Sequence, residues 1–448
     1  MGMASKENWL FWRPNRVLLR KLIVKHMGGR CDDAETVTHT IRPIEQVNLH
    51  LVLDRWLEQS NPRGRLVGYT RETFFGNTGI SQLLHDDVLQ APVQRQRISI
   101  NATDEVDCVQ RGLYLLYYKG KPIIVLLSAP EPRYEPPQVE LLARERALAQ
   151  EAMQKLLEET AKNSVYKSKT ICIEQEERGG AIRVRFQPMP PISRESLVLP
   201  EQLLTVIERN VLGMLRHGEL LRRAGRSTRH GLLLHGPPGT GKTLMLRYLA
   251  SNCPNHTVIM LNGRQAGLIR ESCQVARMLA PSLVLLEDVD LIGEDRASNR
   301  CPVVLQDLMD EMDGLGTKAE VIFLLTTNRP EVLEPALSGR PGRIDQAVEF
   351  PLPDEDCRRR LFLLYGKGLE MSRVDLSRWI DRTRGVSPAF IEELLRKSAL
   401  LAAERGERAD PLPLTDADIE NAMQELICFG GELTQKLLGF KTFGFGPR

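Results

Sequence analysis

One segment dominates the sequence: Gly236-Pro237-Pro238-Gly239-Thr240-Gly241-Lys242-Thr243. It follows an apolar run at 232–234 and precedes a helical pattern that begins at Leu244. The order of strand, glycine-rich turn and helix fits the pattern G-x-x-x-x-G-K-S/T. Glycine frees the backbone to turn successive N–H groups inward, and the start of the helix adds a positive dipole. We therefore predict a phosphate-binding loop that extends from Gly236 to Leu244.

Two side chains at the end of this segment add more specific chemistry. The Lys242 ammonium can reach the β- and γ-phosphates of a nucleotide, and the Thr243 hydroxyl can ligate Mg²⁺. A chance match in a glycine-rich turn is the alternative, and the flanking strand and helix patterns argue against it. A nucleoside triphosphate and Mg²⁺ are therefore the predicted ligands.

Further apolar runs alternate with helical patterns after this loop, at residues 258–261, 283–286, 321–325 and 348–350. Such alternation predicts an α/β fold, with a parallel sheet and helices on both faces. Ligands of such sheets bind outside the carboxyl ends of the strands. Polar residues that directly follow the apolar runs are therefore candidates for the same site.

Carboxylates and an amide occupy those positions. Glu287, Asp288 and Asp290 follow one predicted strand, and Asn328 follows the next. Carboxylates there can hold hydrated Mg²⁺ and orient or deprotonate an attacking water. The Asn328 amide offers both a donor and an acceptor, which suits a bridge between water and a γ-phosphate.

Two arginines come shortly afterwards, in Ser338-Gly339-Arg340-Pro341-Gly342-Arg343-Ile344-Asp345. Guanidinium groups so close to a hydrolytic site are typical of arginine fingers, which neutralise the charge that builds up during phosphoryl transfer. Each of these motifs alone has an ordinary explanation as an acidic turn, a polar strand end or a surface pair. Together, in this order, they predict nucleotide hydrolysis.

Residues from about 196 to 430 resemble an AAA ATPase module of the AAA+ superfamily. The matching phrases are Walker A at 236–243, Walker B at 283–290, Glu311-Met312-Asp313-Gly314-Leu315, sensor one at 326–328, and Arg340-Pro341-Gly342-Arg343 as the finger region. The resemblance implies a P-loop NTPase αβα sandwich, an α-helical lid and a hexameric homo-oligomeric ring. In such a ring, Arg340 and Arg343 would reach the nucleotide of the neighbouring subunit. Gly385-Val386-Ser387-Pro388-Ala389-Phe390 resembles the family's lid phrase near the ribose and adenine, with Pro388 in place of the usual glycine.

The sequence departs from the family pattern in two further places. Walker B usually ends in Asp-Glu and here ends in Glu287-Asp288, an inverted pair similar to that of the AAA translocase of the mitochondrial Rieske protein. By position, Asp288 takes the water-polarising role and Glu287 the Mg²⁺ shell, although the division of roles between them stays open. Residues 263–270 contain no aromatic residue, whereas peptide-threading relatives carry one there, and this puts stepwise threading in doubt.

The first half of the chain predicts a separate α+β domain that we do not recognise. Its signals are a helix near 47–57, a hairpin at 113–127, a helix at 139–161 and a hairpin at 171–186. Residues 9–25 form a basic amphipathic pattern that we interpret as a surface helix packed on this domain. The predicted domains are an N-terminal recognition domain at 1–191, an ATPase domain at 192–353, a lid at 354–430 and a C-terminal tail at 431–448.

The composition is that of an ordinary globular protein. The 448 residues are 42% hydrophobic and 26% charged, with a net charge of +2, which gives no general attraction to nucleic acid. Eight scattered cysteines indicate reduced thiols in a cytoplasmic protein. No apolar run approaches the roughly 20 residues of a transmembrane segment.

From these observations we expect an Mg²⁺-dependent ATP hydrolase that couples hydrolysis to the remodelling of a macromolecular client, most simply a protein. One alternative is a nucleotide-dependent scaffold or switch with little turnover. Another is a nucleic-acid-associated AAA+ ATPase, against which the near-neutral charge argues. The identity of the client is not encoded in any motif of the sequence.

Overall fold

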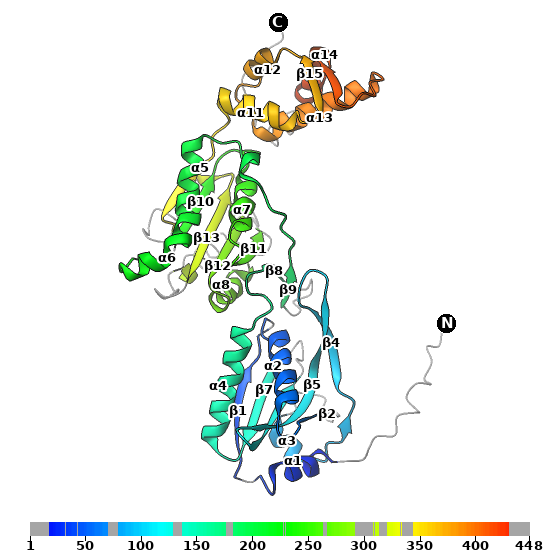
Figure 1. Cartoon of the computed structure of the whole chain (residues 1–448), viewed down its shortest axis with the longest axis vertical. Helices are drawn as coiled ribbons and strands as arrows, with labels where there is room; N and C mark the ends of the chain where they lie inside the picture. The colour runs from blue at the N-terminus through cyan, green and yellow to red at the C-terminus, as the bar shows by residue number, and fades with distance from the viewer. Residues whose placement is uncertain are drawn as a thin grey trace, which may run out of the picture. The chain divides into compact units, whose positions relative to one another are not determined.

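The computed structural model describes residues 18–31, 33–42, 44–69, 79–128, 137–175, 182–226, 228, 230–262, 267–291, 308, 310–312, 320–331, 333 and 344–429. The chain divides into two compact units (Figure 1). The first comprises Met1–Lys167 and Ile171–Gln187, and the second comprises Ser168–Thr170 and Pro188–Arg448. Each unit has its own sheet and its own buried core, so each is described separately.

The first unit is built on an antiparallel sheet with the strand order β1-β7-β6-β5-β2-β3, in which β4 also pairs with β5. β8 and β9 form an antiparallel hairpin. In chain order the elements are α1 (Leu19–Met27), β1 (Glu35–Thr40), α2 (Gln46–Gln59), β2 (Arg65–Tyr69), α3 (Ile80–His85), β3 (Gln90–Ala91), β4 (Gln94–Ser99), β5 (Glu105–Tyr118), β6 (Lys121–Ser128), β7 (Gln138–Ala143), α4 (Arg146–Lys162), β8 (Thr170–Gln175) and β9 (Ile182–Phe186).

Alternating side chains of the central strands fill two cores, one on each face of the sheet. Tyr114 and Val125 join the core under α2 and α4, whereas Leu113 and Ile124 join the core under α1 and α3. This is the period of two that a strand imposes on its side chains. Helices therefore cover both faces of the sheet, and the N-terminal α+β fold predicted from the sequence is confirmed.

The predicted helix at 139–161 begins too early. Residues 138–143 form β7, which lies between β1 and β6, and α4 begins only at Arg146. Val139 and Leu141 are fully buried against the neighbouring strands. Burial between two strands outweighs the helix propensity of the Leu-, Ala- and Glu-rich stretch that follows.

The second unit carries a parallel sheet in the order β14-β10-β13-β12-β11. Helices α5 and α7 share one hydrophobic core with it, and α8 packs against β11 and β12 (Figure 1). The α/β fold with a parallel sheet is confirmed. Its elements are η2 (Arg194–Ser196), α5 (Glu201–Glu208), η3 (Arg209–Gly213), α6 (Met214–Arg223), β10 (His230–His235), α7 (Lys242–Ser251), β11 (Thr257–Asn262), α8 (Ile269–Met278), β12 (Ser282–Glu287), β13 (Val321–Thr327) and β14 (Gln346–Glu349).

The C-terminal part of the second unit forms the lid, coloured yellow to red in Figure 1. Its core is built around the fully buried Trp379, Phe362 and Phe390. Besides helices it contains a two-stranded parallel sheet of β15 and β16, which the sequence did not predict because each strand is only four or five residues long. The lid comprises α11 (Glu355–Tyr365), β15 (Leu369–Arg373), α12 (Leu376–Arg382), α13 (Pro388–Glu404), β16 (Leu412–Thr415), α14 (Asp416–Gln424) and η6 (Glu425–Phe429).

Among the described residues, no helix combines the length and the apolar character that crossing a membrane requires. Several stretches singled out in the sequence lie outside the described residues. These are residues 9–17 of the basic N-terminal pattern, 263–266, 313–315, the arginine pair at 340 and 343, and the predicted tail at 431–448.

Candidate nucleotide-binding site

The phosphate-binding loop connects β10 to α7, and its glycines occupy backbone conformations that other residues avoid. Gly236, Gly239 and Gly241 have φ angles of 145°, 73° and 95°. A Cβ on Gly236 would lie only 2.4 Å from the carbonyl oxygen of Phe350, directly after β14. The loop can therefore pack against the end of the sheet only with glycine at this position.

Lys242 begins α7 and is 5% exposed. Its ammonium donates hydrogen bonds to the carbonyl oxygens of Gly236 and Pro237, both at 2.8 Å. Burial lowers the pKa of Lys242 to about 8, while Asp288 and Asp290 act in the opposite direction. The ammonium has three donors, so one remains for a phosphate oxygen. The chain thus fixes a cation in the middle of the loop.

Asp288 directly follows β12 and adopts a left-handed backbone conformation, with φ of 50°. Such a conformation costs a residue other than glycine about 1–3 kcal/mol and is found preferentially at functional sites. The backbone N–H of Asp288 donates to the Thr326 hydroxyl at 3.0 Å, and the Asn328 amide donates to Asp288 Oδ1 at 3.1 Å. The turn after β12 is therefore fixed against the end of β13, and it holds the Asp288 carboxylate beside Asn328.

Asp290 has a different position from Asp288. It is 5% exposed and accepts hydrogen bonds from the Thr327 hydroxyl at 2.9 Å and from the backbone N–H of Asn328 at 3.2 Å. Through these bonds Asp290 supports the backbone at Thr327 and Asn328, the predicted sensor residues. Because both bonds converge on one buried oxygen, Asp290 serves to orient the end of β13.

Glu287 ends β12 beside Asp288. Its Oε1 atom is buried and has no hydrogen-bond partner within the described part of the chain. Burial raises the pKa of Glu287, the Arg247 charge lowers it, and the adjacent Asp288 raises it again. Burial likewise raises the pKa of Asp288, as does Asp290, whereas Lys242 and the Asn328 hydrogen bond lower it. Two neighbouring carboxylates in this environment favour a bound cation.

The residues present fit Mg²⁺. In nucleotide sites this ion is held by one or two protein oxygens together with phosphates and water. The Thr243 hydroxyl at the start of α7 and Glu287, whose Oε1 has no hydrogen-bond partner among the described residues, would supply hard oxygen ligands, with Asp288 next to them. When bound, the ion would neutralise negative charge on the phosphates.

The first turn of α13 in the lid rests on the phosphate-binding loop. The backbone N–H of Ala389 donates to the carbonyl oxygen of Gly239 at 3.2 Å. A Cβ on Gly239 would lie 2.9 Å from both Ala389 Cβ and Ser387 Oγ. Between loop and lid lies a cavity of about 690 Å³, which is large enough for a nucleotide. It is lined by Ser196, Pro238, Gly239, Gly241, Lys242, Thr243, Leu244, Asp288, Asn328, Leu364, Tyr365, Pro388, Ala389 and Glu392.

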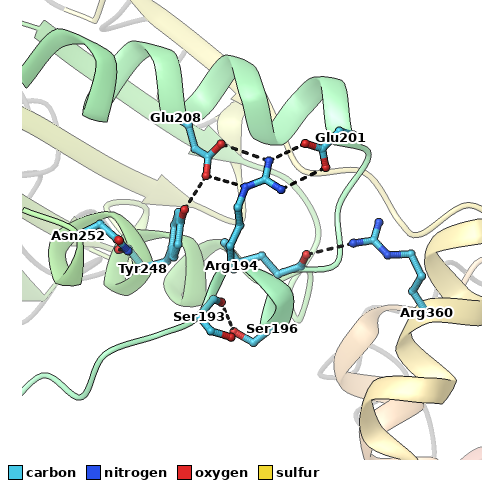
Figure 2. Close-up of polar contacts among 9 residues, drawn as sticks. Ser193, Arg194, Ser196, Glu201, Glu208, Tyr248, Asn252 and Arg360 are labelled. Carbon is cyan, nitrogen blue, oxygen red and sulfur yellow. Dashed lines mark hydrogen bonds and ion pairs between the residues drawn. The ribbon is translucent and has the colours of Figure 1, made fainter. Parts of the chain in front are cut away.

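A polar network that the sequence analysis did not anticipate holds the segment before α5 (Figure 2). Arg194 bonds to both Glu201 and Glu208 at the two ends of α5, with shortest distances of 2.6 Å and 3.0 Å. The Tyr248 hydroxyl, on the helix that follows the phosphate-binding loop, donates to Glu208. From the lid, Arg360 donates to the carbonyl oxygens of Leu199 at 3.1 Å and Leu197 at 3.5 Å. These contacts position Ser196, which lines the cavity.

Other predicted residues have ordinary structural roles or are not described. Glu311 bonds to Arg277 on α8 and lies 3.6 Å from Arg270, and Met312 is fully buried. Arg340 and Arg343 lie outside the described residues, so the structure does not show where the predicted fingers reach. Among the cavity residues from the lid, Pro388 and Ala389 belong to the predicted lid phrase. Leu364, Tyr365 and Glu392 were missed because no local motif marks them, although Glu392 follows Pro388 by four, the spacing of one helical face.

The glycine loop lies at the carboxyl end of β10, the amide of Asn328 follows β13, and the acidic pair lies at the end of β12. This arrangement on a parallel sheet defines a P-loop NTPase domain. Comparison with known proteins supports this assignment for the same region. Residues 232–352 match the model of the ATPase family associated with various cellular activities (AAA). The chain therefore carries an AAA ATPase domain.

Curated proteins show the same relationship. The chain is 36% identical to the ATP-dependent zinc metalloprotease FtsH of Acidothermus cellulolyticus, over 48% of this chain and 34% of that protein. It is 30% identical to the cell division cycle protein 48 homologue of Archaeoglobus fulgidus, over 56% and 36%. It is 32% identical to the proteasome-activating nucleotidase of Thermococcus gammatolerans, over 48% and 57%. The chain thus spans between about a third and somewhat over half of the length of these relatives.

Proposed function

We propose that this protein is an Mg²⁺-dependent ATPase that uses hydrolysis to remodel a protein client. The observation that carries the proposal is the hydrogen bond of 3.1 Å between Asn328 and Asp288, at the edge of the same cavity that contains Lys242. A cation for the phosphates and a supported carboxylate beside them are the two groups that hydrolysis of a β–γ bond requires. The AAA relatives support the general activity.

In this proposal the residues divide the work. The loop from Gly236 to Leu244 and Lys242 hold the triphosphate, and Thr243 and Glu287 hold Mg²⁺. Asp288 accepts a proton from the attacking water, and Asn328 orients that water and the γ-phosphate. The order Glu287-Asp288 leaves a second assignment, in which the two carboxylates exchange roles.

Assembly into a homo-oligomeric ring, most simply a hexamer, belongs to the same proposal. Arg340 and Arg343 would then complete the site of a neighbouring subunit and stabilise the charge that develops during hydrolysis. The similarity to an ATP-dependent zinc metalloprotease and to a proteasome-activating nucleotidase supports a protein as the client. The first unit would recognise that client, and the scattered cysteines support the cytoplasm as the compartment.

One observation favours a second candidate, a nucleotide-dependent switch with little turnover. The carboxylates at the end of β12 stand in the order Glu287-Asp288, the reverse of the usual Asp-Glu. The shorter Asp288 side chain displaces the water-polarising carboxylate by about one carbon–carbon bond, and a displacement of this size can slow hydrolysis strongly. In a switch, nucleotide binding alone would change the contacts between loop and lid.

The experiment that tests the proposal is the rate of phosphate release per subunit across protein concentrations that span assembly. An arginine finger contributes about 10³–10⁵ in rate in other systems, so specific activity should rise steeply on oligomerisation. An Arg340→Ala variant should remain slow at all concentrations. A flat specific activity in the wild-type protein would contradict completion of the site by a neighbour.

A further inference from the structure

Glu392 is a carboxylate inside the nucleotide cavity that neither the predicted phosphate site nor the proposed hydrolysis uses. It lies on α13, one turn after Pro388 and Ala389, and lines the same cavity as they do. One helical turn advances about 5.4 Å along the helix. Because Ala389 contacts Gly239 of the loop, Glu392 lines the wall of the cavity one turn beyond the loop contact.

The Glu392 carboxylate is available for a ligand. It is exposed and forms no hydrogen bond or ion pair with any residue that the structure describes. The next residue along the helix contrasts with it, because Glu393 accepts two hydrogen bonds of 2.7 Å from Arg396. Glu393 is therefore occupied on the helix surface, and Glu392 is the acid that reaches the cavity.

The chemistry of a nucleotide restricts what this carboxylate can bind. An ionised carboxylate only accepts hydrogen bonds, and so do phosphate oxygens, so the two repel each other. The donors of an adenine nucleotide are the sugar hydroxyls and the exocyclic amine of the base. Glu392 must therefore face the nucleoside, and the cavity must hold the phosphates at the Lys242 side.

Among these donors the sugar hydroxyls fit best. Leu364 and Tyr365 of α11 line the same cavity and offer apolar and aromatic surface, which suits the faces of a base. Two adjacent hydroxyls match the two oxygens of one carboxylate, and acidic side chains bind ribose hydroxyls in this way in other nucleotide-binding folds. Burial raises the pKa of Tyr365, and the negative charge of nearby Glu392 raises it further.

We propose that Glu392 binds the 2′- and 3′-hydroxyls of the ribose and so makes this site selective for ribonucleotides over deoxyribonucleotides. The inference rests on the proposed nucleotide-binding function and adds the substrate class. A missing 2′-hydroxyl leaves the carboxylate without one partner. The Glu392→Ala variant removes the carboxylate, and with it the group that would distinguish ribonucleotides from deoxyribonucleotides.

The test is calorimetric binding of ADP, 2′-deoxy-ADP and 3′-deoxy-ADP to the full chain, since diphosphates avoid turnover. We expect the wild-type protein to bind ADP about tenfold more tightly than either deoxy analogue, the effect of a hydrogen bond to a charged group. In Glu392→Ala, all three nucleotides should bind with equal affinity, below that of the wild-type protein for the analogues, because each analogue also loses the one hydroxyl contact that it keeps. The Glu393→Gln variant is the matched control and should behave as the wild type does.

Three results would overturn the inference. Equal affinities for all three nucleotides in the wild-type protein would show that the hydroxyls are not recognised. Unchanged discrimination in Glu392→Ala would assign the recognition to another residue. The diphosphate of purine riboside lacks the exocyclic amine of ADP. If the wild-type protein bound ADP more tightly than this analogue and Glu392→Ala did not, Glu392 would contact the base instead of the ribose. Tight ADP binding with any of these results leaves the proposed function standing, whereas no binding of any nucleotide refutes both.

Discussion

At the end of the cavity where we propose that the phosphates bind, Lys242 is buried and Asp288 is half-buried, and both are held by contacts within one sheet edge. Lys242 is bonded to its own loop, and Asp288 is bonded to the end of the neighbouring strand. At the nucleoside end, Ser196, Tyr365 and Glu392 come from a connecting segment and two lid helices. The contacts that join these parts span 161 and 163 residues of the chain, from Arg360 to the carbonyl oxygens of Leu199 and Leu197.

This difference indicates that the two ends of the cavity contribute to different properties of the site. Buried charges in a rigid frame cannot be replaced without loss of binding or chemistry, because nothing nearby can compensate. Half-buried and exposed groups that come from separate elements contribute smaller increments, which set selectivity. Substitutions at the phosphate end should therefore have effects of orders of magnitude, and substitutions at the nucleoside end should have effects of several-fold.

The largest effect is expected from Lys242→Ala. Removing a buried cation from a phosphate site typically costs 2–5 kcal/mol, so nucleotide affinity should fall by about 100-fold or more. Thermal stability should not fall with it, because the buried ammonium is itself poorly solvated. Calorimetric titration with ADP and a thermal unfolding scan measure both. Binding within tenfold of the wild type would remove the contrast between the two ends.

Glu287→Gln sharpens the account of the metal. If Glu287 belongs to the Mg²⁺ shell, its amide should raise the Mg²⁺ concentration for half-maximal phosphate release by about tenfold, with less effect on the rate at saturating Mg²⁺. Initial rates across a magnesium titration provide the measurement. A large loss of rate that excess Mg²⁺ does not restore would show that Glu287 and Asp288 have exchanged roles.

Arg360→Ala tests the nucleoside end. Loss of its bonds to Leu197 and Leu199 should loosen the lid over the segment that carries Ser196 and weaken ADP binding about fivefold, the effect of roughly one hydrogen bond. Arg359→Ala is the matched control, because Arg359 bonds only to Glu355 on its own helix among the described contacts. Equal affinities of these two variants would contradict a role of Arg360 in holding the cavity.

The smallest effect concerns the network in Figure 2 and depends on pH. Burial alone would raise the pKa of Glu208, yet hydrogen bonds from Arg194 and Tyr248 hold that pKa below its ordinary value. A depressed carboxylate pKa stabilises the fold above the unfolded value near 4.5, and this contribution is lost as the pH falls through the folded value. Glu208→Gln should therefore be less stable by about 0.5–1 kcal/mol at pH 7. In denaturant titrations the difference should shrink below pH 4.5, and a constant difference would contradict the ion pair.

That Lys242, Asp288 and Asn328 lie together at one cavity could be predicted from the sequence for a physical reason. Residues at the carboxyl ends of neighbouring parallel strands must meet at one edge, so the positions of Asp288 and Asn328 follow from the strand order. The glycine loop is likewise a local feature between one strand and one helix. These inferences need only the order of apolar and polar residues along a short stretch.

The nucleoside end could not be predicted in this way. Arg360 supports the cavity through hydrogen bonds to carbonyl groups 161 and 163 residues away, and Glu392 lines the cavity because the lid packs on the loop. No local pattern marks either residue. The same limit explains β7, where pairing with two strands overrode a helical pattern. It also explains the short strands β15 and β16 in a lid that was expected to be helical.

The central claim is that Asp288 and Asn328 form a hydrolytic site beside the cation of Lys242. Its most direct test is the steady-state rate of phosphate release from saturating ATP and Mg²⁺ by the wild-type protein and by Asp288→Asn, with ADP affinity measured for both. The account predicts similar affinities and a rate at least about 100-fold lower in the variant, the usual contribution of a positioned general base. Equal rates, or no magnesium-dependent release by the wild-type protein, would contradict it.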